Sequence, residues 1–135
     1  MANALYDKGR EGFLDGNIDW DTNTIKFVFI DHTDDTPNTS TDDNLDDLSA
    51  PSRVGTSGAL ATKTVTNGVA DADDVTVTAV TGDQFESINL FKDTGVESTS
   101  RLIAYIDTAT GLPFTPSGGD IIVRWDSGAN KIFKL

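Results

Sequence analysis

Residues 25–30 read IKFVFI, and they form the most hydrophobic stretch of the chain. The odd positions hold one isoleucine and two phenylalanines, and the even positions hold lysine, valine and isoleucine. Because successive side chains of an extended chain point to opposite faces, apolar residues fall on both faces here. The stretch therefore predicts a central β-strand whose second face is also partly covered.

Further stretches with strand character follow at a spacing of about ten residues. They lie near Val54 and over residues 62–66, 75–80, 85–92, 101–107, 121–125 and 130–135. Turn dipeptides separate some of them, namely Asn67-Gly68 and Gly82-Asp83. We expect residues 75–80 and 85–92 to form one hairpin. Residues 121–125 and 130–135 flank DSGA and predict a last hairpin.

The best helix candidate is the segment NALYDKGREGFLD, residues 3–15. Its apolar side chains fall roughly on one side, and Asn3 stands where an N-cap residue is needed. Gly16 follows the segment and is placed to end the helix. The chain is thus predicted to begin with one short helix.

The segment from residue 31 to residue 52 is acidic and rich in turn-forming residues. Within it Leu45 and Leu48 stand three residues apart, a spacing that places two side chains on one helix face. Ser40 and Thr41 precede them as candidates for the cap. We therefore expect a long loop that carries one or two helical turns.

Seven to nine short strands joined mostly by tight turns predict a mainly β protein. The pattern favours an antiparallel β-sandwich or barrel, with the short N-terminal helix packed beside it and one short helix in the acidic loop. The length predicts a single compact domain over residues 1–135. No repeat of about 20 to 50 residues is visible, which argues against a solenoid.

The acidic residues are distributed unevenly between the two types. Of the 22 acidic residues 19 are aspartate and three are glutamate, and threonine is about as abundant as aspartate. Aspartate side chains bond to nearby backbone groups and so favour turns and helix caps, whereas threonine suits strands. This composition is typical of a turn-rich β protein.

The net charge of −12 leaves ten lysines and arginines scattered singly along the chain. Such a field repels phosphate, so we expect no binding to nucleic acid. No apolar run approaches the roughly 18 residues of a membrane span, and the first residues, MANALYDKGREGF, lack the apolar stretch of a signal peptide. We expect a protein that is made in the cytoplasm, stays soluble and enters no membrane.

Equipment for catalysis is sparse, since the chain has no cysteine and His32 is its only histidine. His32 lies in the acidic loop, and GTSG at residues 55–58 lacks the G-x-S-x-G spacing of a nucleophile elbow. His32 is therefore expected to be an exposed loop residue rather than the base of a Ser-His-Asp site. No dinucleotide-binding, P-loop or zinc-protease motif occurs. We expect a protein that is not an enzyme, with a small hydrolase built from paired carboxylates as an open alternative.

Asp71, Asp73 and Asp74 form a cluster that invites a calcium site. An EF-hand loop starting at Asp71 would need glycine and glutamate where the chain has Thr76 and Gly82. We favour a solvated turn there, and a polar helix face for the aspartates at 42, 43, 46 and 47. Neither a metal nor a cofactor is expected, although a calcium site of another kind stays open. Four aromatic side chains are expected to fill the core rather than to stack on a ligand: Tyr6, Trp20, Tyr105 and Trp125.

Three long segments of the chain resemble a family of small structural proteins of tailed-bacteriophage virions. They are ALYDKGREGFLDGNIDW, SGALATKTVTNGVADADDVT and SRLIAYIDTATGLPFTPSGGDIIVRWDSGANKIFKL, and together they cover most of the chain. The resemblance implies a virion origin and carries no catalytic motif. From size, charge and fold class we expect a head decoration or cement protein, which sits on the outer surface of the head and clamps capsid subunits.

This expectation implies the major capsid protein as the partner and a homo-oligomer, a trimer or a dimer, as the assembly. Contacts to the shell are expected on the least acidic surfaces. The candidates are Lys8 and Arg10 in the N-terminal segment and Lys131 and Lys134 in the C-terminal strand. A tail- or fibre-associated module that recognises a host surface or a carbohydrate is the alternative.

Overall fold

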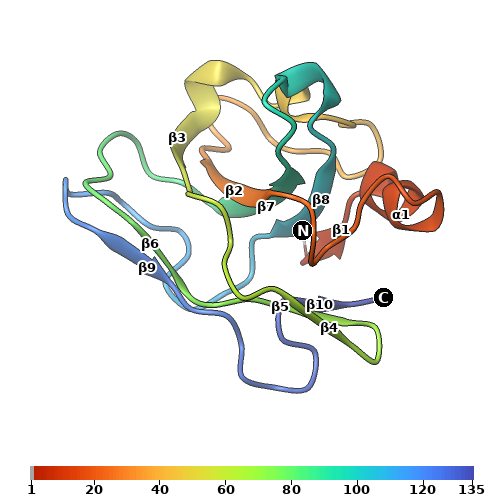
Figure 1. The fold of residues 1–135 in the computed structure, drawn as a ribbon. Coiled ribbons are helices and arrows are strands. Elements are labelled where there is room, and N and C mark those ends of the chain that lie inside the picture. Colours follow the sequence, from red (N-terminus) through yellow and green to blue (C-terminus); the bar gives the residue numbers. More distant parts are fainter. Residues whose placement is uncertain (1) are drawn as a thin grey trace.

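The predicted central strand is β2 (Ile25–Ile30), which lies inside a five-stranded antiparallel sheet. The fold is taken from a computed structural model, which describes residues 2–135. The strand order is β1-β8-β7-β2-β3 (Figure 1). Its other members are β1 (Ala4–Leu5), β3 (Arg53–Thr56), β7 (Ser87–Lys92) and β8 (Leu102–Ile106). The sheet forms one layer of the molecule.

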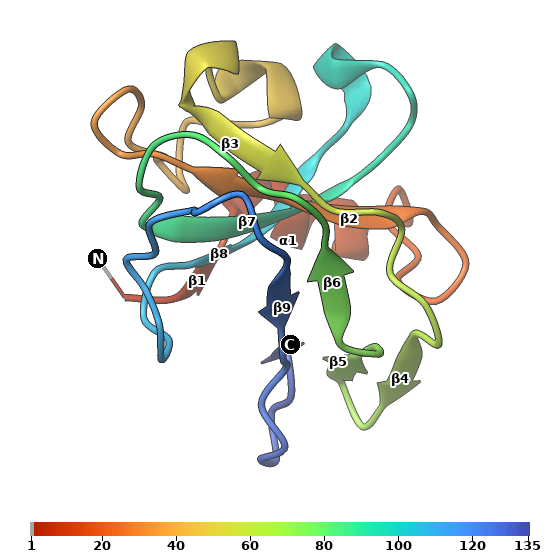
Figure 2. The same ribbon diagram turned by 90° about the vertical axis from the view of Figure 1, so that its left-hand side faces the viewer.

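Two smaller antiparallel sheets form the opposite layer (Figure 2). One has the order β10-β5-β4, and the other is the pair β6-β9. Their strands are β4 (Thr64–Thr66), β5 (Val69–Asp71), β6 (Val75–Val77), β9 (Ile121–Val123) and β10 (Phe133–Lys134). The predicted mainly β, antiparallel, sandwich-like fold is confirmed. The sheets are not closed on themselves, so the barrel form of the prediction is wrong.

The main core lies between the two layers. Phe27 and Phe29 of β2 are fully buried in it, and the ring of Phe29 stacks on Phe85 at a centroid distance of 4.1 Å. The small sheets contribute apolar side chains from the other side, among them Val77 and Ile121. Alternation along β2 therefore buries one face of the large sheet, as the sequence predicts.

The second face of the large sheet is covered by the acidic loop. Val28 and Ile30 of β2 are fully buried there, packed in a separate cluster with Leu45 and Leu48. The loop carries two 3-10 turns, η1 (Leu45–Asp47) and η2 (Ala50–Ser52), and a third, η3 (Glu97–Thr99), lies beside it. The predicted helical turns are confirmed. The cap of η1 is Asn44, however, in a reciprocal box with Asp47, because Ser40 and Thr41 stand too far upstream to reach it.

The predicted helix is α1 (Asp7–Leu14), four residues shorter at its start than the sequence suggests. Asn3 does not cap it, because the Asn3 side chain is bonded to the backbone of residues 107 and 108 instead. The helix begins after Tyr6, whose side chain makes no cap hydrogen bond. Gly16 follows the helix with a φ of +78°, as expected of a residue that ends it.

Both predicted hairpins are wrong, although their strands exist. β6 pairs with β9 rather than with β7, and β10 pairs with β5 rather than with β9. β7 lies between β2 and β8, and five of its six side chains are buried, as is typical of a central strand covered on both faces. The Asn67-Gly68 turn instead joins β4 to β5, a strand of three residues that the sequence pattern does not reveal.

Aspartate carboxylates accept hydrogen bonds from nearby backbone N–H groups throughout the loops. Acceptors two residues before the donor are Asp15, Asp31, Asp93 and Asp126, and acceptors three or four residues after it are Asp42 and Asp47. These are the short-range bonds that fix turns and caps. The predicted link between the aspartate excess and turns is therefore confirmed.

Candidate functional site

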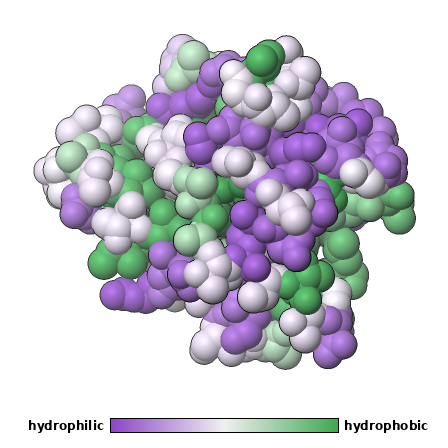
Figure 3. All heavy atoms as spheres, in the orientation of Figure 1, coloured by the Kyte–Doolittle hydropathy of each residue, from purple (hydrophilic) through white to green (hydrophobic). Residues whose placement is uncertain are grey.

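One end of the molecule combines exposed apolar side chains with cations. Val65 of β4 is 55% exposed and Leu135, next to β10, is 60% exposed, while the exposed Lys134 of β10 lines the adjoining groove on the other face of this small sheet. Figure 3 shows hydrophobic atoms reaching the surface on the lower right, around the C-terminal end of β10. We call this surface the apolar–basic end and define it by Arg10, Val65, Lys131, Lys134 and Leu135.

A shallow hollow of about 300 Å³ opens at the apolar–basic end. Its lining is mostly apolar and comprises Phe13, Gly16, Ile18, Asp19, Trp20, Val65, Gly68, Ala70, Phe133 and Leu135. The ring of Phe133 lies 5.8 Å from Phe13 and 5.3 Å from Trp20, the second in an edge-to-face arrangement. The Trp20 indole donates to the Asp71 carbonyl at 3.1 Å. The hollow thus has rigid aromatic walls, a setting in which binding hot spots commonly form.

Three of the four predicted contact residues gather around β10. Arg10 and Lys134 line one groove of about 270 Å³ beside β1 and β8. Lys131 and Lys134 line another of about 370 Å³ beside β4 and β5. The N-terminal and C-terminal candidates, far apart in sequence, therefore meet at one end of the fold. Their role in binding stays a prediction.

Lys8 does not line any of these grooves. Its ammonium group lies 3.2 Å from Glu11, and the Arg10 guanidinium lies 3.0 Å from Asp7, both as exposed pairs on α1. Exposed pairs of this spacing contribute little to stability. Arg10 can therefore exchange its partner for a carboxylate on another molecule at small cost.

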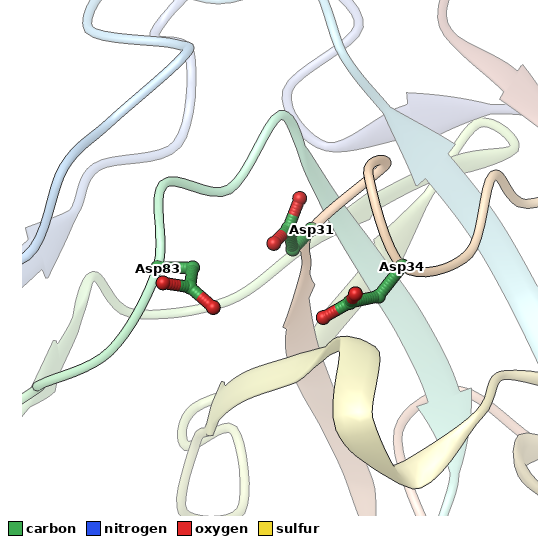
Figure 4. A group of neighbouring side chains, drawn as sticks. All are labelled: Asp31, Asp34 and Asp83. Atoms are coloured by element: carbon green, nitrogen blue, oxygen red, sulfur yellow. The ribbon is translucent and has the colours of Figure 1, made fainter.

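A group of three carboxylates, which the sequence does not predict, lies between the loop that follows β2 and the loop that precedes β7. One oxygen of each of Asp31, Asp34 and Asp83 falls within 4.8 Å of the others (Figure 4). Asp31 is buried and accepts from the Thr33 N–H at 2.8 Å, and the other two are exposed. A hard cation such as Ca²⁺ would find three of its six to eight oxygen ligands here. The sequence hid the group because Asp83 is far from the other two along the chain.

Four aspartates of the clusters considered from the sequence form hydrogen bonds within the fold. Asp73 accepts from the Thr62 hydroxyl, and Asp74 accepts from the Trp125 N–H. Asp42 accepts from the Asn38 N–H, and Asp47 caps η1. Their oxygens are therefore engaged in turns and caps, which is the reading the sequence favours.

His32 lies closer to a serine than the sequence suggests. The His32 ring Nε2 is 2.8 Å from the Ser87 hydroxyl, and the ring stacks on Tyr105. Asn89 donates to Ser87 at 2.9 Å and accepts from the Tyr6 hydroxyl at 2.6 Å. His32 is half-buried rather than exposed, so that prediction is wrong. Ser87 is fully buried, so no substrate reaches its hydroxyl, and the chain of bonds acts as a buried polar network.

The two tyrosines are predicted to make the protein sensitive to alkali. Burial raises the pKa of Tyr6 and of Tyr105 far above the ordinary value of 10. The folded state thus keeps protons that the unfolded chain releases, so stability is complete below about pH 10 and falls as the pH rises above it. In a spectrophotometric pH titration, tyrosinate should appear only together with loss of near-ultraviolet dichroism. Two tyrosines that titrate near pH 10 in a folded protein would contradict this.

Comparison with known proteins adds no family. No protein-family model matches the chain, and no curated protein matches it. Within residues 2–135 there is also no helix with the length and apolar character to cross a membrane.

Proposed function

We propose that this chain is a non-enzymatic structural protein of a tailed-bacteriophage virion. In this proposal it decorates the outer surface of the head and stabilises it by binding the major capsid protein. The observation that carries the proposal is the apolar–basic end on a chain whose net charge is −12. The resemblance of three long segments to virion proteins supports the assignment to a phage particle.

The distribution of charge supports an outer position. An acidic surface keeps a protein soluble and is repelled by packaged DNA, so it suits the exterior of a head better than the lumen. The apolar–basic end then faces the shell, where its aromatic-walled hollow can receive an apolar side chain and its cations can meet carboxylates. A ligand that binds only the assembled shell stabilises that shell by mass action.

Charge reversal at the apolar–basic end tests the proposal. The variant Lys134→Glu should bind heads that lack the protein at least about tenfold more weakly than the natural chain, because attraction becomes repulsion. The matched control is Arg124→Glu, since Arg124 is an exposed cation that lines none of the grooves beside β10. Binding is measured by co-sedimentation with the heads.

Two results would count against the proposal. Absence of binding by the natural chain would remove the capsid as its partner. Equal weakening by Arg124→Glu and by Lys134→Glu, which change the net charge by the same amount, would show that overall charge, rather than this surface, governs binding. Heads saturated with the natural chain should in turn resist heating better than bare heads.

A tail- or fibre-associated module is the second candidate, and one observation favours it. Phe114 is partly exposed and stacks on Phe85 beside a hollow of about 240 Å³ on the other side of the molecule. Exposed aromatic rings can stack on the apolar face of a sugar. Glycan-array binding that Phe114→Ala abolishes, together with labelling of tails rather than heads, would favour this candidate.

A further inference from the structure

β4 is the outermost strand of its sheet, and it is unprotected. Within residues 2–135 it pairs only with β5, and its residues Thr64, Val65 and Thr66 are all exposed and uncharged. Figure 2 shows the β4–β5 hairpin at the margin of the molecule, with nothing beyond β4. Exposed edge strands are templates for pairing with another chain, and proteins usually blunt them with charge, proline or a bulge.

The backbone of Val65 points toward the open edge. Val65 lies opposite Ala70 of β5, and the Ala70 carbonyl accepts from the Ile132 N–H on the far side, at 3.1 Å. The backbone N–H and C=O of Ala70 thus point away from β4, so Val65 and Ala70 form a non-hydrogen-bonded pair of the antiparallel ladder. In such a pair the partner also turns its N–H and C=O outward. Val65 therefore presents one donor and one acceptor to a further strand.

The side chains define a register as well. Val65, Ala70 and Phe133 lie opposite one another across the three strands, and all three line the apolar hollow. Thr64 and Thr66 line the groove on the other face instead. The row of apolar side chains ends at Val65, whose side chain is left more than half exposed.

Charge favours this edge over the rest of the surface for self-association. The net charge of −12 repels a second copy across most faces. Residues 62–68, however, contain no carboxylate, and Lys63 is their only charge. Lys131 and Lys134 line the adjacent groove together with one carboxylate, that of Asp71. The edge itself therefore adds little repulsion between two copies.

We propose that β4 pairs with β4 of a second copy, antiparallel across a two-fold axis through Val65. In this register Val65 faces Val65 and exchanges two backbone hydrogen bonds with it, and Thr64 faces Thr66. The apolar row then continues from one copy into the next, and the sheet becomes six strands wide. A slip by one residue would set Val65 against threonine and break the row, so the register is specified.

The proposed contact between the two β4 strands is short, and its small area limits the affinity of the dimer. Three residues per copy bury less than the roughly 1,200 Å² of a standard stable interface, so the dimer is weak and depends on concentration. Wherever copies are held side by side, the same contact gains from their effective concentration. The inference does not depend on the virion proposal, because it concerns the isolated protein.

Sedimentation equilibrium from micromolar to millimolar protein tests the dimer. The natural chain should pass from monomer mass to dimer mass, whereas Val65→Lys should stay monomeric, because two like charges would meet at the axis. Val96→Lys is the matched control, since Val96 is also 55% exposed but lies in a loop. It should dimerise as the natural chain does.

Three results would overturn the inference: a natural chain that stays monomeric throughout, assembly beyond the dimer, or Val65→Lys that dimerises unchanged. Hydrogen exchange gives a second readout that needs no variant. The Val65 amide should exchange freely in dilute protein and become protected as the concentration rises, while the Val96 amide should not change. Protection that is independent of concentration would also contradict the pairing.

Discussion

Replacing Asn89 with alanine is expected to lower the free energy of unfolding by about 3 kcal/mol. Asn89 is fully buried in β7, where its amide joins the Tyr6 hydroxyl to the Ser87 hydroxyl. Alanine would leave the Tyr6 hydroxyl without its acceptor in a dry cluster, and a cavity would add to that cost. Urea unfolding followed by circular dichroism measures the change.

A double-mutant cycle separates the hydrogen bond from the cavity. Tyr6→Phe alone should cost about 1 to 2 kcal/mol, because it leaves the Asn89 carbonyl oxygen unpaired. In the double variant neither orphaned group is present, so its loss should be smaller than the sum of the two single losses. Strict additivity would mean that the bond from Tyr6 to Asn89 contributes nothing, which would contradict the network described here.

Replacing Gly9 with alanine is expected to destabilise the fold by about 3 kcal/mol despite the better helix propensity of alanine. Gly9 sits on the face of α1 that packs against β8. An added Cβ would lie 2.7 Å from the Ile103 carbonyl oxygen and 2.9 Å from its Cα. Both neighbours are backbone atoms of a buried strand, so neither can turn aside and the helix must move.

Two other glycines supply matched controls for this prediction. At Gly12 the added Cβ would lie 2.5 Å from Cδ1 and 2.7 Å from Cγ1 of Ile18 and 3.4 Å from the Arg101 guanidinium. These are side-chain atoms, which can move more easily than backbone, so Gly12→Ala should cost less than Gly9→Ala. At Gly58 nothing lies within 4 Å, and alanine should be neutral or slightly stabilising. Thermal unfolding of the three variants gives the order, and a Gly9→Ala variant as stable as Gly58→Ala would contradict the close packing of α1.

The strands could be predicted from sequence more reliably than their partners. Short runs of apolar residues identify β2 and β7 as strands, because such runs are typical of a strand that is covered on both faces. Pairing depends on which strands share a layer, and no local pattern reports that for β6 and β9. The sequence pattern also does not predict the short strand β5, because three residues show too little periodicity.

For the candidate site, too, the sequence predicts local features but not the contacts between residues that are far apart in the chain. The sequence identifies the cations Arg10, Lys131 and Lys134 as the exceptions in an acidic chain, but only the fold brings them together. The sequence does predict the aspartates in turns, because an aspartate that bonds to backbone a few residues away is a local feature. The network through His32 and Ser87 joins residues far apart in the chain, so no short sequence motif predicts it.

We propose that the protein sits on the outside of a phage head with its apolar–basic end toward the shell. Electron-microscopic reconstruction of purified phage particles that contain this chain is the sharpest test of that position. We expect stoichiometric density for the protein on the outer capsid surface, with β10 and the hollow beside Val65 against the capsid protein. Particles without this density, or with the acidic loop of residues 31–52 against the shell, would contradict the proposed position.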